Sequence, residues 1–318
     1  MVEVTVQVPE NDREYFGTKP IISKHTLHKT LHFDDSELIE IMDNIPRSNL
    51  RVWSQDREVR DFSSYMYVDT TGIRGKDLLD CVKRGEFWVN LQRVDKFFDQ
   101  YKKLSSQLYE SLTAQCPHLE VAFVHSYILL SSANMYFQLH VDSYENMFWC
   151  VRGGKDFYLY PPSDKRVAPQ EFMEDICAGV REDFLPHVEE NQSLRKKFRV
   201  VPGDLLSWPQ HSPHEFVNND QFNVGLGTFH ETRDSVKRIL NYQSSRYFRE
   251  NLPFLRGRVD HDSLSMTFRR TLYRGIRKIR RPPAPQKVDF WTNYRLDPEQ
   301  PNCMAKIEDG PVLAECSR

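Results

Sequence analysis

Residues 131–162, SSANMYFQLHVDSYENMFWCVRGGKDFYLYPP, carry most of the information about the fold. An apolar alternating segment precedes the triplet His140-Val141-Asp142, and another follows it and turns back through Gly153-Gly154. Alternation with a period of two is typical of strands that bury one face, and a glycine pair between two such runs is typical of a hairpin. The stretch therefore predicts an antiparallel sheet that carries a histidine and a carboxylate.

His140 and Asp142 have the chemistry of metal ligands. Two imidazoles and one carboxylate on one face of an iron(II) ion leave the opposite positions open, as non-haem oxygenases require. The triplet alone is weak evidence, because the chain contains a second copy, His32-Phe33-Asp34. Asp34 and Asp35 precede the amphipathic run 36–42, so we interpret one of them as a helix N-cap and expect no metal at His32.

A third ligand is expected far along the chain, because a barrel brings sequence-distant strands together around one mouth. The segment Trp208–His214 offers His211 and His214. His214 opens the alternating run 215–218, whereas His211 lies between two prolines in a loop. Since the start of a strand holds an imidazole more firmly than a turn does, we favour His214 and place His211 beside the site.

Taken together, these motifs resemble the JmjC/cupin-like Fe(II)- and 2-oxoglutarate-dependent oxygenases, and most closely their asparaginyl-hydroxylase-like branch. The resemblance covers roughly residues 121–232. It rests on His140-Val-Asp142, Asn146, Gly154-Lys155, the run Phe157–Pro162, Pro202-Gly203-Asp204 and Pro209–His214. It implies a mainly β fold with flanking helices, built around a double-stranded β-helix, also called a jelly-roll or cupin barrel.

The resemblance also implies a ligand set and a cosubstrate. His140, Asp142 and His214 match the iron ligands, and Lys155 matches the residue that pairs with the distal carboxylate of 2-oxoglutarate. A carboxylate buried in a barrel needs such a partner, because an unpaired buried charge is costly. The alternative for Lys155 is a solvated turn lysine.

Other positions match the family less completely. Asn146 matches an amide near the other carboxylate end of the cosubstrate. Many relatives place a hydroxyl-bearing residue three positions before the first ligand, where this chain has Phe137. We expect Tyr136, Tyr127 or Ser126 to supply that hydrogen bond instead.

The pattern predicts three segments. Residues 1–118 form a mixed α and β extension that flanks the barrel, 119–232 form the barrel core, and 233–318 form a helical segment and tail. The core is interrupted by an acidic, helical insertion at 163–197, which is either a lid over the site or a pair of helices packed on the surface.

Composition agrees with a soluble globular protein of 318 residues, 39% hydrophobic and 28% charged. No apolar run approaches the roughly 18 residues of a membrane span, and the N-terminus lacks a basic region that would indicate secretion. The six cysteines show no Cys-x-x-Cys spacing. A reducing cytoplasm suits both these thiols and ferrous iron, so we predict a cytoplasmic protein without a membrane partner.

The net charge of −2 does not indicate a nucleic-acid partner. The segment Arg269–Arg281 is nevertheless rich in arginine and lysine and contains no acid. Apolar residues recur in it at helical spacing, from Phe268 to Ile279, so we favour an amphipathic helix over a surface for a phosphate backbone. Such a helix could dock on the barrel or form a homodimer.

The function implied is hydroxylation of an amino-acid side chain (free, peptide or protein) or of a small metabolite, with succinate and CO2 as coproducts. N-demethylation by the same oxidant is one alternative. A non-catalytic cupin scaffold with a structural metal is another, and an adaptor that acts through Arg269–Arg281 is a third. Lys155 and Asn146 favour the oxygenase, since a structural metal needs no dicarboxylate pocket.

Overall fold

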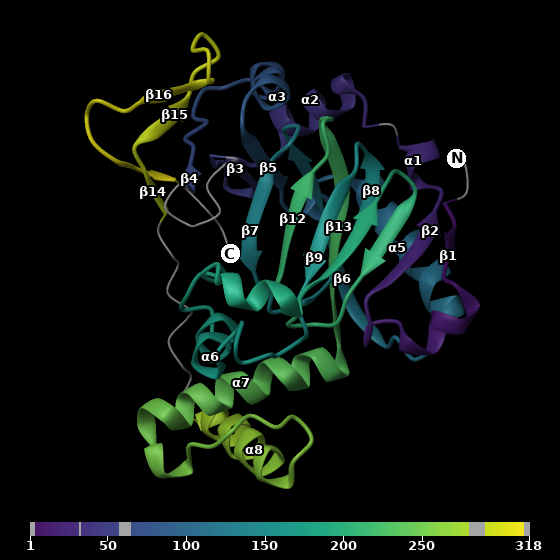
Figure 1. Cartoon of the computed structure of the whole chain (residues 1–318), viewed down its shortest axis with the longest axis vertical. Coiled ribbons are helices and arrows are strands. Elements are labelled where there is room, and N and C mark those ends of the chain that lie inside the picture. Colours follow the sequence, from purple (N-terminus) through teal and green to yellow (C-terminus); the bar gives the residue numbers. More distant parts are fainter. Residues whose placement is uncertain (1–3, 32, 57–64, 280–289, 315–318) are drawn as a thin grey trace.

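The computed structural model describes residues 4–31, 33–56, 65–279 and 290–314. Within these residues, a nine-stranded and a four-stranded antiparallel sheet face each other (Figure 1). The large sheet has the order β1 (Val6–Gln7), β2 (Ile21–His25), β11 (Asp204–Ser207), β8 (Glu145–Arg152), β13 (Asn223–Thr232), β6 (Val121–Ser131), β5 (Phe87–Leu91), β3 (Leu50–Ser54) and β4 (Met66–Tyr67). The small sheet has the order β10 (Lys196–Val200), β9 (Lys155–Leu159), β12 (His214–Asn218) and β7 (Tyr136–His140).

Alternation along the strands gives the space between the sheets an aromatic lining. Phe216 of β12 pairs with Phe157 of β9, and their ring centroids lie 4.9 Å apart. Glu215 and Tyr158, also paired, come next along the two strands and therefore face the opposite side of the small sheet. The mainly β architecture predicted from the sequence is confirmed. The predicted boundaries at 118/119 and 232/233 stay predictions.

Helices cover the outer face of the large sheet and bury the largest hydrophobic cluster against it. As predicted, the helix after the second His-x-Asp has an acidic N-cap, because Asp34 accepts a hydrogen bond from the Glu37 N–H at 2.9 Å. His32 lies outside the described residues. These helices are α1 (Leu27–Thr30), α2 (Asp35–Asn44), α3 (Gly75–Arg84), α4 (Val94–Phe97) and α5 (Asp99–Gln115), with 3-10 turns at Glu10–Tyr15 and Arg47–Asn49.

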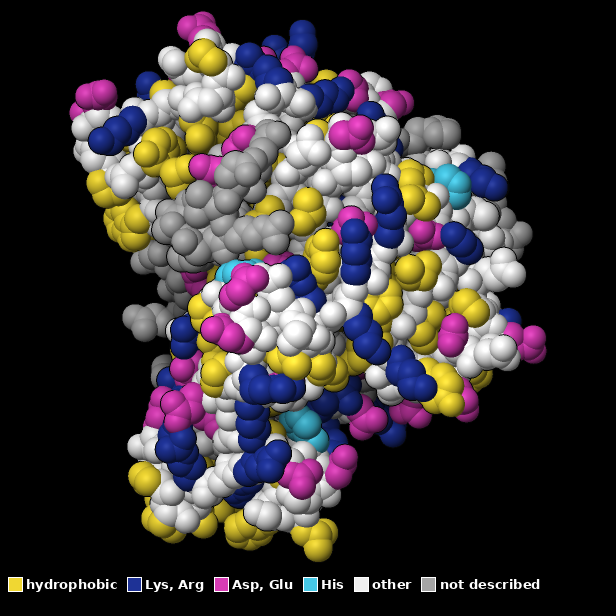
Figure 2. Space-filling view, in the orientation of Figure 1, with side chains coloured by type: hydrophobic (Ala, Val, Ile, Leu, Met, Phe, Trp, Pro, Cys, Tyr) yellow, Lys and Arg dark blue, Asp and Glu magenta, His cyan; other side chains and the backbone are white. Residues whose placement is uncertain are grey.

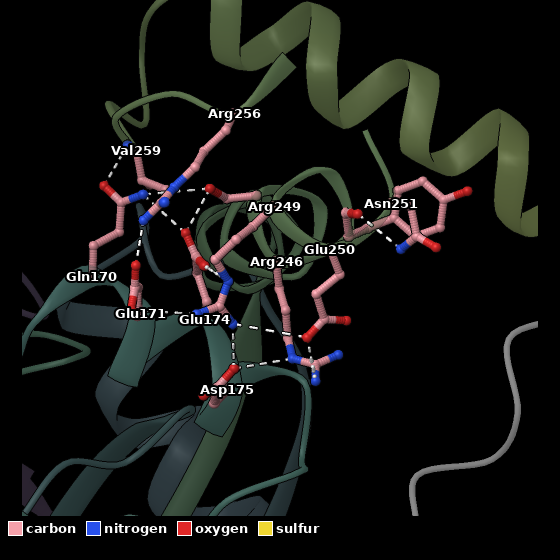
Figure 3. A network of polar contacts seen from close by, with 12 residues as sticks. Gln170, Glu171, Glu174, Asp175, Arg246, Arg249, Glu250, Asn251, Arg256 and Val259 are labelled. Carbon is pink, nitrogen blue, oxygen red and sulfur yellow. Dashed lines mark hydrogen bonds and ion pairs between the residues drawn. The ribbon is translucent and has the colours of Figure 1, made fainter. Parts of the chain in front are cut away.

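The 163–197 insertion contains α6 (Gln170–Cys177) and a 3-10 turn (Glu189–Leu194). Helix α6 packs on α7 (Arg233–Asn251), which crosses the end of the barrel (Figure 1). Figure 3 shows the ion pairs that join them: Arg249 of α7 meets Glu174 at 3.0 Å and Asp175 at 2.6 Å. Because Glu174 is fully buried, this network fixes α6 firmly to α7.

Helix α8 (Leu264–Ile279) docks on α7 and not on the barrel (Figure 1). Its apolar stripe is only partly covered, since Tyr273 is buried whereas Phe268 is 62% and Ile279 86% exposed. Arg269 of this helix is 4% exposed and donates to the backbone carbonyls of Gly257 and Arg258.

Around this end of the molecule, at the bottom of Figure 2, acidic and basic side chains lie side by side. Arg280 and Arg281 lie outside the described residues. The homodimer through these helices stays a prediction.

A 3-10 turn (Pro253–Leu255) joins α7 to the segment before α8. Beyond α8 the chain forms two short hairpins, β14 (Phe290–Thr292) with β17 (Val312–Ala314) and β15 (Tyr294–Leu296) with β16 (Met304–Lys306). None of the described helices combines the length and apolar character needed to cross a bilayer.

Candidate metal centre

The two sheets enclose a cavity of about 830 Å³, and residues of α7 and of the segment 178–184 complete its wall. Aromatic rings from both sheets line it, among them Trp88, Phe148, Phe157 and Phe216. His140, Asp142 and His214 line the same cavity. The wall thus combines aromatic rings with charged side chains that include Arg51, Arg93 and Arg181, and concave sites of this kind are where small molecules usually bind.

The structure brings His140, Asp142 and His214 together. His140 ends β7 and His214 begins β12, and the two residues pair directly across the sheet with ring centroids 4.0 Å apart. Asp142 follows two residues after His140, and its Oδ2 lies 3.3 Å from His214 Nε2. One candidate ligand atom from each residue lies within 4.8 Å of the others.

Hydrogen bonds fix the tautomer of both histidines. The Nδ1 atoms of His140 and His214 lie 2.8 and 3.0 Å from the backbone carbonyls of Gln138 and Ser212. A carbonyl can only accept, so each Nδ1 carries the proton and each Nε2 has a free lone pair. This is the arrangement that presents Nε2 to a metal.

The electrostatics of the three groups suit a cation. Burial lowers the pKa of His214 well below its ordinary value, so its imidazole is neutral. Burial also raises the pKa of Asp142 to about 6, an effect that the neighbouring His140 and a hydrogen bond from Asn146 oppose. Two buried imidazole nitrogens and a partly buried carboxylate are a donor set that a divalent ion such as Fe(II) would satisfy.

Lys155, at the start of β9, lies in the barrel interior and is only 3% exposed. Its Nζ is 4.5 Å from the ring centroid of Phe148, 4.7 Å from Phe216 and 5.1 Å from Trp88. It forms no ion pair with a carboxylate of any described residue. Burial therefore lowers its pKa to about 7. This placement excludes the solvated turn lysine that the sequence left open.

Two other expected residues lie in the cavity wall. Asn146 of β8 hydrogen-bonds Asp142, so it orients a candidate ligand. The Tyr127 ring of β6 packs at a tilt against Phe229, with the ring centroids 4.9 Å apart, and its hydroxyl hydrogen-bonds Arg93. Ser126, next to it, is buried and donates its backbone N–H to Asp95, so it does not line the cavity.

The expectation for Tyr136 is corrected. A β-bulge between the His214–His140 and Phe216–Phe137 pairs lets both His140 and Phe137 line the cavity. Tyr136 lies outside the cavity wall, and its buried hydroxyl donates to Glu215 at 2.6 Å. The sequence alternation alone does not reveal this shift of register.

His211 is not one of the three candidate ligands, and a hydrogen bond to the Ser143 backbone places it beside the loop that carries Asp142, as predicted. Its backbone is left-handed with φ +63°, and its Nε2 lies 3.7 Å from the thiol of Cys177. Burial lowers the pKa of His211 to about 3. It is a neutral, enclosed side chain that packs edge-on against Tyr242.

Sequence reasoning missed the detail of how the insertion shapes the site. Residues 183–185 run beside the free edge of β7: Val141 N–H donates to the Asp183 carbonyl at 3.0 Å, and Leu185 N–H to Leu139 at 2.8 Å. Phe184 thereby lies opposite His140 and lines the cavity. The cluster of acids and aromatics within 163–197 was the only local signal for this contact.

Comparisons with known proteins agree with this architecture. The family model described as a cupin-like domain matches residues 64–236. The solved structure of E. coli ycfD is 14% identical, covers 89% of this chain and 70% of its own, and has a TM-score of 0.50. A second structure, of the E. coli ribosomal oxygenase YcfD in complex with cobalt and 2-oxoglutarate, is 14% identical with coverages of 85% and 68% and a TM-score of 0.44.

Proposed function

This chain belongs to the cupin-like domain family, and we propose that it is an Fe(II)- and 2-oxoglutarate-dependent oxygenase. One observation carries the proposal: a His-Asp-His group with free Nε2 atoms shares a cavity wall with the rings that surround a buried lysine, and this lysine has no acidic partner among the described residues. A structural metal would need the first feature only. The second feature calls for an anion, and 2-oxoglutarate supplies one.

The residues divide the work as follows. His140 and His214 would bind iron through Nε2 and Asp142 through a carboxylate oxygen, with Asn146 holding that carboxylate in place. Lys155 would pair with the distal carboxylate of 2-oxoglutarate among the aromatic rings, which exclude water. Iron and 2-oxoglutarate, when bound, supply the oxidation of a substrate C–H bond by O2 together with formation of succinate and CO2.

For the reaction we propose hydroxylation of an amino-acid side chain, free, in a peptide or in a protein, or of a small metabolite. N-demethylation would use the same centre. The second structure named above is described as a ribosomal oxygenase of E. coli, and a protein substrate is therefore the first to test. A cytoplasmic location goes with this proposal.

The proposal is tested by Fe(II)-dependent formation of succinate from 2-oxoglutarate, compared between wild type, His140→Ala, Asp142→Ala and His211→Ala. We expect the first two variants to lose the activity and His211→Ala to retain it. A wild-type protein that binds iron and gains stability from it, yet forms no succinate above the metal-free background, would favour the alternative of a metal-binding cupin scaffold.

A further inference from the structure

The two loops that carry Asp142 and His214 are joined by a buried polar network. Gln210, four residues before His214, donates through Nε2 to the carbonyl of Ser143 at 2.6 Å. Ser143 directly follows Asp142 in the chain. The Gln210 side chain is 5% exposed, so this hydrogen bond forms away from bulk water and ties one ligand loop to the other.

The guanidinium of Arg238 on α7 binds both Gln210 and Glu145, a residue close to Asp142 in the chain. Arg238 donates through Nε to Gln210 Oε1 at 2.5 Å and through Nη2 to Glu145 Oε1 at 2.9 Å. Glu145 opens β8, three residues after Asp142. The planar guanidinium fits two acceptors at once, which a lysine could not do with the same geometry.

Further hydrogen bonds fix Glu145. Its Oε2 accepts from the hydroxyl of Thr232 at 2.9 Å, and His230 Nε2 lies 3.5 Å away. Tyr109 of α5 lies in turn 3.0 Å from His230 Nδ1. The buried carboxylate is therefore held by groups from β13 and α7, and it offers Arg238 a rigid counter-charge.

We propose that Arg238 is a positioning residue, which through Gln210 and Glu145 sets the distance between Asp142 and His214. The proposal rests on the metal centre of the proposed function. Arg238 touches none of the three candidate ligands, and it acts on the loops that carry two of them. Without the guanidinium, Gln210 loses the partner of its amide oxygen, and the Ser143 carbonyl is held less firmly.

The chain offers a matched control on the same helix. Arg246 has a similar exposed fraction, 26% against 29%, and also forms an ion pair, with Asp175 of α6 at 3.0 Å. Figure 3 shows that Arg246 points toward Asp175 and Glu250. Arg246→Met therefore removes a half-buried arginine from α7 without touching either ligand loop.

The experiment measures the dissociation constant of Fe(II) by anaerobic competition with a chromophoric chelator, and the urea stability of the metal-free proteins. We expect Arg238→Met to weaken Fe(II) binding about 10- to 100-fold, and Arg246→Met to stay within about twofold of wild type. Gln210→Met should weaken binding similarly, and the double variant should be no worse than the stronger single variant, since both act on one connection.

Gln210→Met also carries the test if Arg238→Met fails to fold. Fe(II) affinity within about twofold of wild type in both network variants would overturn the positioning role, as would an equal loss in Arg246→Met. A wild-type protein without affinity for Fe(II) would be a different failure, because it would overturn the proposed function itself.

Discussion

Replacing Lys155 by methionine should stabilise the metal-free protein. Methionine has a similar length and is apolar, so it can occupy the space among Trp88, Phe148 and Phe216 without a charge. The ammonium in that space has lost its water and has gained no carboxylate among the described residues. The buried ammonium therefore lowers the stability of the metal-free protein, which is expected of a group whose charge is neutralised only when a ligand binds.

The size of the effect follows from the pKa of Lys155, which burial lowers from 10.5 to about 7. Each unit corresponds to about 1.4 kcal/mol, so the penalty is about 5 kcal/mol below pH 7 and about 4 kcal/mol at pH 7. Between pH 7 and pH 10.5 the unfolded chain holds the proton and the folded chain does not, so wild-type stability rises with pH. The advantage of methionine should therefore fall to about 2 kcal/mol at pH 9.

The assay is urea unfolding of the metal-free proteins at pH 7 and pH 9. Lys197→Met is the control, because Lys197 is exposed on β10 and pairs with Asp156 at the surface. We expect that variant to stay within about 0.5 kcal/mol of wild type at both pH values. The reasoning would be refuted if Lys155→Met were less stable than wild type, or if its gain in unfolding free energy did not change with pH. Either result would mean that Lys155 is not a buried ammonium without an acidic partner among the described residues.

Two of three further predictions concern the same cavity, and the third concerns the N-cap of α2. The affinity for 2-oxoglutarate should be constant below pH 7 and fall up to about tenfold per pH unit above it, because the dianion binds the protonated form of Lys155. Isothermal titration calorimetry at several pH values measures this affinity, and an affinity that does not change with pH would contradict the prediction. Gly225→Ala should weaken 2-oxoglutarate binding in the same titration, because the added Cβ would collide with the Phe148 ring that packs on Lys155. An unchanged affinity would show that the ring can move freely. Asp34→Ala should lower the free energy of unfolding in urea by about 1 kcal/mol, because it removes the side chain that accepts from the Glu37 N–H. Asp34→Asn should lower it less, and equal losses in the two variants would argue against the cap.

The candidate ligands could be predicted from the sequence because the signals are local. His140 and His214 each stand at the end of a short alternating strand, and these two strands pair so that the histidines meet. Lys155 follows a glycine turn, so its place on a strand could be inferred, but its burial among three rings could not. That depends on strands β5, β8 and β12, which converge only in the folded barrel.

Other features of the site depend on contacts between distant residues and left no pattern in the sequence. The bulge in the pairing of β7 with β12 adds one residue, and this single shift turns Tyr136 away from the cavity. Arg238 meets Glu145 across 93 residues and Gln210 across 28. No spacing rule links these three positions, so the support of the candidate metal centre became visible only in three dimensions.

The most direct test of the account is an anaerobic titration of the Fe(II)-loaded protein with 2-oxoglutarate, in which chelation by the 2-oxo acid produces a weak visible charge-transfer band. We predict a band that is absent in His214→Ala, persists in His211→Ala and needs far more 2-oxoglutarate in Lys155→Ala. Wild-type protein that binds iron but shows no band at saturating 2-oxoglutarate would contradict the account.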